Sequence, residues 1–479
     1  MSEPTLKDKT AKGLFWGGLS NLIQQLIGMV FGIAIARILS PDDYGLVAML
    51  AVFSAIANTL MDSGFGVALI NKKEIKHEDY NAVFWFSIGV SLFVYILLFF
   101  AAPYIAKFYN EPVLTNLSRL IFISFIFAGS GIAHNALLVK QLKVKQRGII
   151  DVTSVLSSGA IGLVMALNGY AFWGLAVQQL TQNFVGAALR WYFSGWRPTF
   201  TFNFGPIKEM FGFSSKLLAN SILAQITGNL FNIILGHNYG KKDTGYYAQG
   251  NKWMFLGFTT ITGMIKSVAQ PVLVEVKDDL NRQAVVYRKM LRFGAFVSFP
   301  AMLGLAFVAS EFIALTIGSK WENSVIYLQV LSIAMSFEFL TTINVTLLLS
   351  HGYSNWLLKY SFFINIVTLL ILFICSPFGI LTMVVVYSIW RIISAFSWIF
   401  FVIRILPISF FGFLKDIGSY LGVAVFAFAV GLVVNKLVNG GLGVTFIVKI
   451  VSVGVTYVLV LYVLGSAALK EVLHYLFRR

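Results

Sequence analysis

The chain has 479 residues, of which 58% are hydrophobic and only 12% are charged, and its formal net charge is +16. A soluble protein carries about a quarter charged residues, so this composition excludes a soluble globular enzyme or binding domain. The positive charge does not indicate a nucleic-acid partner, because no polar segment is long enough to form a separate basic domain. The single cysteine, Cys375, excludes a disulfide framework and a thiolate metal site.

Apolar segments of about 20 residues, the length that crosses the hydrocarbon layer, recur along the chain. We predict fourteen transmembrane helices, at residues 13–36, 44–66, 82–106, 117–138, 150–168, 170–193, 213–236, 246–272, 290–309, 324–349, 356–375, 379–402, 415–435 and 443–464. The polar N-terminus shows no short apolar stretch with a cleavage site, so we expect the first helix to be retained. The segments between helices are short. An all-α polytopic membrane protein follows, because lipid offers no partner for open backbone.

The distribution of Lys and Arg predicts the orientation of these helices. With the N-terminus in the cytoplasm, 24 of the 36 basic residues fall on the inner side, 6 on the outer side and 6 within spans. This asymmetry is what the positive-inside rule expects. We therefore predict that both termini are cytoplasmic. The C-terminal segment ALKEVLHYLFRR has the pattern of an amphipathic helix that lies at the membrane surface.

An internal repeat is visible at an offset of 200 residues. Residues 25–48 align without a gap with residues 225–248, and seven of the 24 positions are identical. One of the matched elements is the Asp-x-Gly that begins at Asp43 and recurs at Asp243. The alternative explanation is that two hydrophobic helices align through composition alone.

Six predicted spans separate the two copies, so both copies run through the membrane in the same direction. Parallel repeats of this kind form two lobes related by an axis along the membrane normal. We predict an N-lobe of helices 1–6 at residues 1–209 and a C-lobe of helices 7–12 at residues 210–409. Residues 410–479 then hold two additional helices, 13 and 14, and the C-terminal interfacial helix.

The first helix of each predicted lobe carries a polar face. Amides that face acyl chains are costly, so these side chains must face protein or a water-filled cavity. Two interpretations are open: a cavity between the lobes, or plain hydrogen bonding between helices that glycines allow to approach closely. The candidate cavity residues are Asn21, Gln24, Gln25, Asn220, Gln225, Asn229 and Asn232.

The eighth predicted helix carries two lysines and no acid between them. Lys252 and Lys266 are 14 residues apart, which at about 100° per residue brings them within about 40° of one direction. Thr259 lies halfway and extends the same stripe. The alternative is that each lysine, about six residues from a helix end, reaches the interface along its own flexible stem.

Further charged residues lie inside the predicted spans. Arg391 and Glu338 are near the middle of helices 12 and 10, at similar depth, which predicts a buried ion pair. Otherwise Arg391 contacts an anion while Glu338 binds a coupling proton or Na⁺. Lys216 and Arg119 lie near helix ends, where they either line a cavity or reach the interface. Asp62, near the inner end of helix 2, is expected to cap or hinge that helix, or to belong to an inner gate.

Two other residues in spans have simpler interpretations. Lys449 is on an additional helix outside the repeat, and we expect its ammonium to reach the interface. His134 lies near the inner end of helix 4, and we expect a polar contact there rather than a proton-transfer site.

Several segments resemble bacterial polysaccharide exporters. They read KGLFWGGLSNLIQQLIGMVFGIAIARILSPDDYGLVAM, MDSGFGVALINKKEIKHEDYNAVFWFSIGVSL, NALLVKQLKVKQ and FGFSSKLLANSILAQITGNLFNIILGHNYGKKDTGYYAQ. The similarity runs from about residue 6 to residue 465 and is strongest through helix 9. The ordered series of segments is more specific than any one of them. The chain resembles the Wzx-type flippases of the multidrug/oligosaccharidyl-lipid/polysaccharide superfamily, in the colanic-acid and O-antigen branch.

This resemblance implies a fold similar to that of MATE exporters, with two six-helix lobes around a cavity. It implies that the protein flips an undecaprenyl-pyrophosphate-linked oligosaccharide between leaflets of the bacterial plasma (inner) membrane by alternating access. We expect a monomeric transporter unit with membrane lipids around it and a polysaccharide polymerase or export complex as partner.

A pyrophosphate crosses a low-dielectric layer at great cost unless fixed cations or water accompany it. The basic residues in spans are therefore candidates for a cationic path. They are Lys252, Lys266, Arg391, Lys216 and Arg119. Flexible ammonium groups suit a ligand that must slide along such a path.

Two other functions remain open from the sequence. A small-molecule or drug antiporter on the same fold would call for buried acids, whereas six basic residues in spans outnumber Asp62 and Glu338. A polymerase, ligase or glycosyltransferase would need a large outer loop or a cytoplasmic catalytic domain, and no metal-ligand cluster or nucleophile motif is visible. We therefore expect a protein that is not an enzyme, without catalytic residues, metal or cofactor other than a coupling ion, H⁺ or Na⁺.

Overall fold

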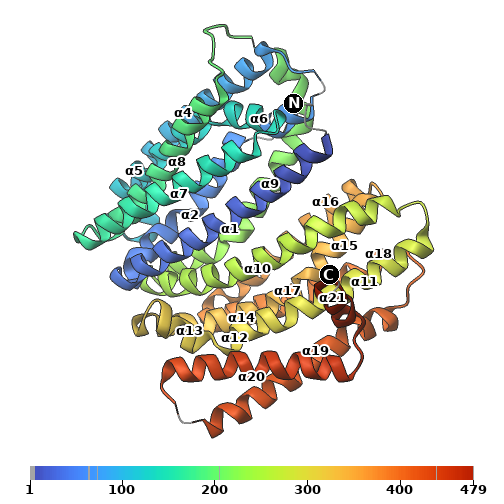
Figure 1. Ribbon diagram of the computed structural model, residues 1–479. Helices are drawn as coiled ribbons and strands as arrows, with labels where there is room; N and C mark the ends of the chain where they lie inside the picture. The colour runs from blue at the N-terminus through green and yellow to red at the C-terminus, as the bar shows by residue number, and fades with distance from the viewer. Residues whose placement is uncertain (1–5, 63–64, 73, 204, 439, 478–479) are drawn as a thin grey trace. The chain divides into compact units, whose positions relative to one another are not determined.

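The computed structural model describes residues 6–62, 65–72, 74–203, 205–438 and 440–477, and this part of the chain contains helices but no strand (Figure 1). The chain divides into two compact units, Met1–Gly245 and Tyr246–Arg479. Each unit is described by itself. The division falls later than residue 209, where the repeat places the boundary between lobes. The lobes are defined by duplication of the sequence, and their boundary stays a prediction.

The first unit is a bundle of long helices. Its helices are α1 (Leu6–Ile38), α2 (Pro41–Asp62), α3 (Phe65–Asn71), α4 (His77–Tyr109), α5 (Leu114–Ser130), α6 (Ile132–Lys140), α7 (Val144–Leu167), α8 (Phe172–Ser194), α9 (Gly205–Asn238) and the first turn of α10 (Lys241–Glu275). Helix α1 packs on α7, α7 on α8, α8 on α5 and α5 on α4, while α9 packs on α2 and α4. The core includes the fully buried rings of Phe122 and Phe125 from α5.

The second unit contains the rest of α10 and the remaining helices. They are α11 (Leu280–Ser298), the π-helical turn η1 (Phe299–Leu303), α12 (Gly304–Phe307), α13 (Ala309–Thr316), the 3₁₀ turn η2 (Ser319–Ser324), α14 (Val325–Met335), α15 (Glu338–Ser350), α16 (Ser354–Cys375), the 3₁₀ turn η3 (Ser376–Phe378), α17 (Ile380–Ser397), α18 (Ile399–Val402), α19 (Phe410–Leu437), α20 (Leu442–Val463) and α21 (Ala467–Phe477). Helix α17 packs on α14 and α16, and α19 packs on α11 and α20.

Every predicted transmembrane segment corresponds to helix in the part of the chain that the structure describes, which leaves out residues 63–64 of the second span. Within the described residues, eleven segments are long and apolar enough to cross a membrane. The other three predicted spans correspond to α8, α9 and α10, which have 23, 34 and 35 residues but carry amides or lysines along their length. The prediction of an all-α polytopic membrane protein is confirmed, and the polar exceptions include two helices that the sequence assigned to a cavity.

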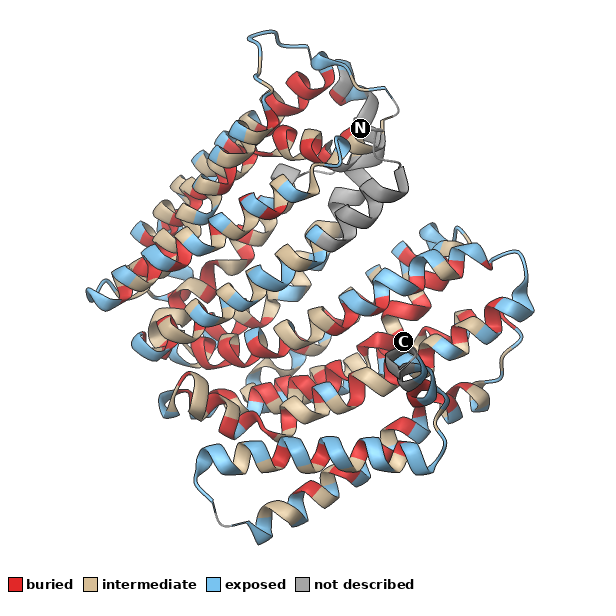
Figure 2. Cartoon of the chain, viewed as in Figure 1, coloured by how far each residue is buried: buried red, intermediate tan, exposed pale blue. Residues whose placement is uncertain are grey.

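Large apolar side chains lie on the outside of the helices. Along α20, for example, Ile447 is 61% exposed and Val463 is 82% exposed, and Figure 2 shows exposed residues along this helix. In water such a surface would drive aggregation. In a bilayer it is the expected contact with acyl chains.

Several membrane-crossing segments of the described chain are interrupted, and one of them, Ile380–Val402, breaks at Trp398 between α17 and α18. The segment of α5 and α6 breaks at Gly131, and that of α14 and α15 breaks at Ser336 and Phe337. These are the fourth and tenth predicted spans, which occupy equivalent places in the two repeats. The segment that begins with α11 passes through the π turn η1 directly after Ser298. The Ser298 hydroxyl donates a hydrogen bond of 2.8 Å to the Ser336 carbonyl, so two of these irregular points are joined.

Candidate functional site

The strongest ionic contact predicted inside the membrane is present. Arg391 on α17 and Glu338, the first residue of α15, meet with 2.7 Å between Nη2 and Oε1. Their side chains are only 25% and 10% exposed. The Nε atom of Arg391 is buried with no acceptor among the described residues. The guanidinium is therefore held by one carboxylate and keeps one donor that could bind a further acceptor.

The break between α14 and α15 positions this pair. Because α14 ends at Met335 and α15 begins at Glu338, the carboxylate lies in the first turn of a new helix, inside a membrane-crossing segment. A helix N-terminus carries a partial positive charge that favours an anion. Interrupted helices in transporters often mark the place where charged groups act. The similar depth of the two residues predicted the pairing, but no residue pattern predicted the break.

Helix α10 presents the predicted cationic stripe on an uncovered face. Lys252 and Lys266 are exposed, and Gln270, one turn further on, is exposed too. A Cβ added at Gly263, on the same face, would meet nothing within 4 Å. Thr259 is half-buried, and its hydroxyl donates a hydrogen bond of 2.9 Å to the Phe255 carbonyl of the same helix. The lone pairs of the hydroxyl oxygen can still accept a hydrogen bond.

The two lysines differ in their surroundings. The Lys252 Nζ lies 5.7 Å from the centre of the Trp253 ring, within the range of a cation–π contact. Lys266 lies nearer the C-terminal end of the helix and is followed five residues later by Pro271, which stands inside the helix. The expected one-sided row is thus present in α10, and whether it lines a passage stays a prediction.

The amides of α1 and α9 are partly engaged with one another. The Gln25 side-chain amide donates a hydrogen bond of 3.3 Å to the side-chain oxygen of Asn21. Asn21 is exposed, and Gln24 is half-buried. Asn229 donates 3.0 Å to the Gln225 carbonyl. The side-chain oxygen of Asn232 is buried without a donor among the described residues. Hydrogen bonding along a helix therefore accounts for part of these faces.

Some glycines of α1 and α9 support close helix packing, and others do not. A Cβ at Gly236 would lie 2.7 Å from the Tyr109 ring, so this glycine allows close packing of α9 on α4. Gly28 and its repeat equivalent Gly228 would meet nothing within 4 Å. Close packing explains Gly236, but it does not explain the equivalent glycines Gly28 and Gly228.

Three predicted residues cannot be placed. The side chains of Lys216, Asn220 and Asp62 lie outside the described residues, although each stands on a helix. Arg119 is described and is engaged within the first unit. Its guanidinium lies 4.2 Å from the centre of the Phe99 ring, and its Nε donates 3.4 Å to the Phe99 carbonyl, so it packs α5 against α4.

The expectation for Lys449 is wrong. Instead of reaching the interface, its Nζ forms a 2.7 Å ion pair with Glu311 of α13, and the two side chains are only 11% and 9% exposed. Glu311 was missed because it lies just beyond the predicted end of helix 9. His134 makes the expected polar contact, with 2.8 Å between its Nδ1 and the Ser194 hydroxyl.

A second buried acid was also missed. Asp416 of α19 accepts from Arg288 and Arg292 of α11, with shortest distances of 2.6 and 2.7 Å, and its side chain is 3% exposed. The sequence signal was the spacing of Arg288 and Arg292, which places both guanidiniums on one helix face. Within the described residues, no group of three His, Cys, Asp or Glu side chains could hold a metal ion.

Comparison with known proteins identifies the family to which the chain belongs. A family model described as "Polysaccharide biosynthesis protein" matches residues 34–326. The chain is 27% identical over 335 residues to the lipopolysaccharide biosynthesis protein WzxC of Escherichia coli, which covers 69% of this chain and 67% of that protein. It is 26% identical over 395 residues to the teichuronic acid biosynthesis protein TuaB of Bacillus subtilis, which covers 82% of each.

A solved structure shows the same fold. An inward-facing multidrug resistance MATE family transporter superposes with a TM-score of 0.63 at 14% identity, over 80% of this chain and 98% of that chain. At this identity the likeness shows the fold alone. The predicted MATE-like architecture is thereby confirmed.

Proposed function

Because the chain belongs to the family of polysaccharide biosynthesis proteins, we propose that it is a flippase for a lipid-linked oligosaccharide in surface-polysaccharide export. It carries an undecaprenyl-pyrophosphate-linked repeat unit from the cytoplasmic to the outer leaflet of the bacterial plasma membrane. The MATE-like fold supports transport by alternating access. In this proposal the chain forms and breaks no covalent bond, and its parts act only to bind, shield and release.

The observation that carries the proposal is the uncovered polar stripe of α10. Lys252, Lys266 and Gln270 are exposed on one face of a helix that lies in a membrane protein. Ammonium groups facing lipid would be costly, whereas the same groups facing a wet passage would attract an anion. The pyrophosphate of the carrier is the anion that such a passage fits. The lysines give it successive contacts about 14 residues, or roughly 20 Å, apart along the helix.

The Arg391–Glu338 pair is assigned a coupling role in this proposal. Arg391 is held by Glu338 at 2.7 Å, so its guanidinium is less available to the substrate than the lysines of α10 are. Protonation of Glu338, or Na⁺ bound to it, would release Arg391 toward the pyrophosphate. This exchange would link the movement of H⁺ or Na⁺ to the binding of the anion.

The orientation follows from the count of basic residues. The excess of Lys and Arg on one side supports cytoplasmic N- and C-termini. The transporter unit is a monomer in this proposal, and a polysaccharide polymerase or export complex takes up the oligosaccharide at the outer leaflet.

The test is flipping of a labelled lipid-linked oligosaccharide in proteoliposomes. Loss of one charge-assisted contact of about 1.5–3 kcal/mol lowers the rate by roughly tenfold or more. We therefore expect Lys252→Gln and Lys266→Gln each to slow flipping, and the double variant to slow it further. The matched control is Lys436→Gln, because Lys436 is an exposed lysine at the end of α19, outside the repeat.

Two results would contradict the proposal. The cationic path is refuted if the double variant, folded and inserted normally, flips at the unsubstituted rate. Ion-gradient-driven export of a lipophilic dye cation, without any flipping of the oligosaccharide, would identify an antiporter instead.

A further inference from the structure

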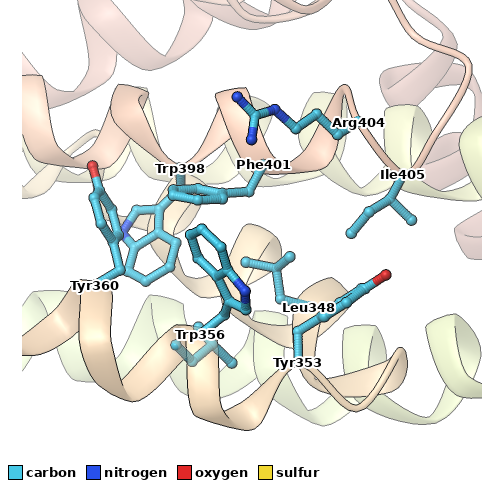
Figure 3. A pocket seen from close by; sticks show the side chains of 9 residues that line it. Leu348, Tyr353, Trp356, Tyr360, Trp398, Phe401, Arg404 and Ile405 are labelled. Atoms are coloured by element: carbon cyan, nitrogen blue, oxygen red, sulfur yellow. The ribbon is translucent and has the colours of Figure 1, made fainter.

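A pocket of about 190 Å³ lies in the second unit, outside the residues discussed above (Figure 3). Aromatic side chains form most of its lining. They come from the start of α16 and from the end of α17 with α18: Tyr353, Trp356, Tyr360, Trp398 and Phe401. Arg404 also lines the pocket, from the segment that follows α18.

One side of the pocket is formed by closely packed aromatic rings, and the other side by rings that are exposed. Tyr360 packs edge-on against Trp398 with ring centres 4.6 Å apart, and Phe401 lies 4.8 Å from Tyr360. Trp398 is buried, whereas Trp356 is 57% exposed and Tyr353 is 44% exposed. The packed side is therefore a fixed aromatic wall, and the exposed rings leave apolar surface that an incoming chain would cover.

Arg404 is a cation without a partner among the described residues. Its side chain is exposed, and no carboxylate, carbonyl or ring of the described chain pairs with its guanidinium. Figure 3 shows it reaching along the same side of the pocket as Phe401 and Trp398. Arg288, Arg292 and Arg391, by contrast, all have carboxylate partners. Arg404 therefore offers an uncompensated positive charge at the rim of an apolar pocket.

The pocket lies where three membrane-crossing segments end. These segments are Ser319–Ser350, Ser354–Phe378 and Ile380–Val402. Aromatic rings are typical of this boundary between hydrocarbon and water. The predicted orientation places the boundary at the cytoplasmic leaflet, where basic pockets between helices bind phosphate-bearing lipid head groups.

We infer that this pocket binds one anionic phospholipid of the surrounding bilayer. Part of an acyl chain lies on Tyr353 and Trp356, and the phosphate binds the Arg404 guanidinium. Charge complementarity selects the lipid, because a net negative head group neutralises Arg404 and a zwitterionic one does not. The Tyr360 hydroxyl already donates a 2.6 Å hydrogen bond to the Ser397 hydroxyl, so its proton is not available to a sugar.

The test is native mass spectrometry of the purified, delipidated full chain. It is titrated with palmitoyl-oleoyl phosphatidylglycerol or with phosphatidylcholine of the same two chains. We expect the phosphatidylglycerol complex to form at lower lipid concentration. One basic side chain near a membrane surface contributes about 1 kcal/mol to binding an anionic lipid, so Arg404→Gln should weaken phosphatidylglycerol binding roughly fivefold and weaken binding of the zwitterionic phosphatidylcholine less.

Matched variants separate charge from packing. Lys359→Gln removes an exposed cation of α16 that does not line the pocket, and should leave both lipids unaffected. Trp356→Ala should weaken both lipids, while Phe373→Ala, an exposed aromatic on the same helix, should weaken neither. Equal binding of the two lipids, or no effect of Arg404→Gln, overturns the inference. Binding of undecaprenyl phosphate with no phosphatidylglycerol binding also overturns it, because the occupant is then the carrier.

Discussion

Gly45 and Gly245, which are equivalent in the repeat, pack reciprocally against each other's helix starts. A Cβ on Gly45 would lie 1.8 Å from the Lys241 carbonyl oxygen, and a Cβ on Gly245 would lie 1.9 Å from the Pro41 carbonyl oxygen. Lys241 is the repeat equivalent of Pro41. Reciprocal contacts of this kind are what a two-fold relation between similar elements produces. The contact therefore supports duplication over a chance alignment of apolar helices.

This contact predicts that Gly45→Ala and Gly245→Ala destabilise the protein. Each methyl group would overlap backbone, which cannot move as a flexible side chain can, and overpacking typically costs about 1–3 kcal/mol. The measurement is the unfolding temperature of the purified protein in detergent. Gly28→Ala and Gly228→Ala are the controls, since those positions are open. Equal stability of all four variants would contradict the close approach.

The Arg391–Glu338 pair predicts a non-additive double variant. Removing one partner of a buried pair leaves an uncompensated charge and costs about 3–5 kcal/mol. We expect Glu338→Gln and Arg391→Gln each to lower the unfolding temperature strongly, and the double variant to recover much of the loss. Additive effects on stability would show that the two side chains do not act on each other.

Transport by the same double variant separates structure from coupling. A pair that only supports the fold would give normal flipping once stability returns. The coupling role proposed above predicts that flipping stays low and no longer responds to an ion gradient.

The Lys449–Glu311 pair predicts that the additional helices are docked by charge as well as by packing. Lys449→Met should destabilise the protein by about 3 kcal/mol or more, because the Glu311 carboxylate would be left buried alone. Adding Glu311→Gln should restore most of the stability. Lys436→Met provides the comparison for an exposed lysine and should have little effect. Protease cleavage between α19 and α20 would report whether the helices loosen.

His351 predicts a pH dependence of stability. This residue lies between two membrane-crossing segments, and 2.8 Å separates its Nε2 from the side-chain oxygen of buried Gln283. Burial lowers the pKa of His351, Lys277 lowers it further, and Asp278 partly opposes the shift. The folded protein thus binds fewer protons than the unfolded chain, so this contribution is present above the ordinary pKa of about 6.5 and is lost as the pH falls.

We therefore expect the unfolding temperature to drop between about pH 7.5 and 5.5. His351→Gln should reduce the drop, because the replacement has no proton to gain. A drop of the same size in that variant would assign the effect to other groups.

Much of the fold was predictable because hydrophobic length is a strong signal. Within the described residues each of the fourteen predicted spans corresponds to helix, and the depth of Arg391 and Glu338 predicted their contact. Lys449 was misjudged because its partner Glu311 lies two residues past a predicted helix end, so the sequence showed a lone cation. Asp416 and Arg288 lie 128 residues apart, the first at the very start of a predicted span and the second in an inner segment, where charges ordinarily face water.

The break between α14 and α15 was not predictable for a different reason. Ser336 and Phe337 are ordinary residues for a membrane helix, and no glycine or proline marks the break between α14 and α15. Which face of α10 or α9 is covered also depends on packing between distant helices, and hydrophobic pattern alone does not contain that information.

The joining of Ser298 to Ser336 has a mechanical consequence. A regular helix in lipid resists bending because each backbone bond must stay closed, with no solvent to replace it. Where α11 gives way to η1 and α14 to α15, one hydroxyl already substitutes for the regular ladder. Bending of the second unit at this joint would therefore stretch one side-chain hydrogen bond, directly before the helix that begins with Glu338.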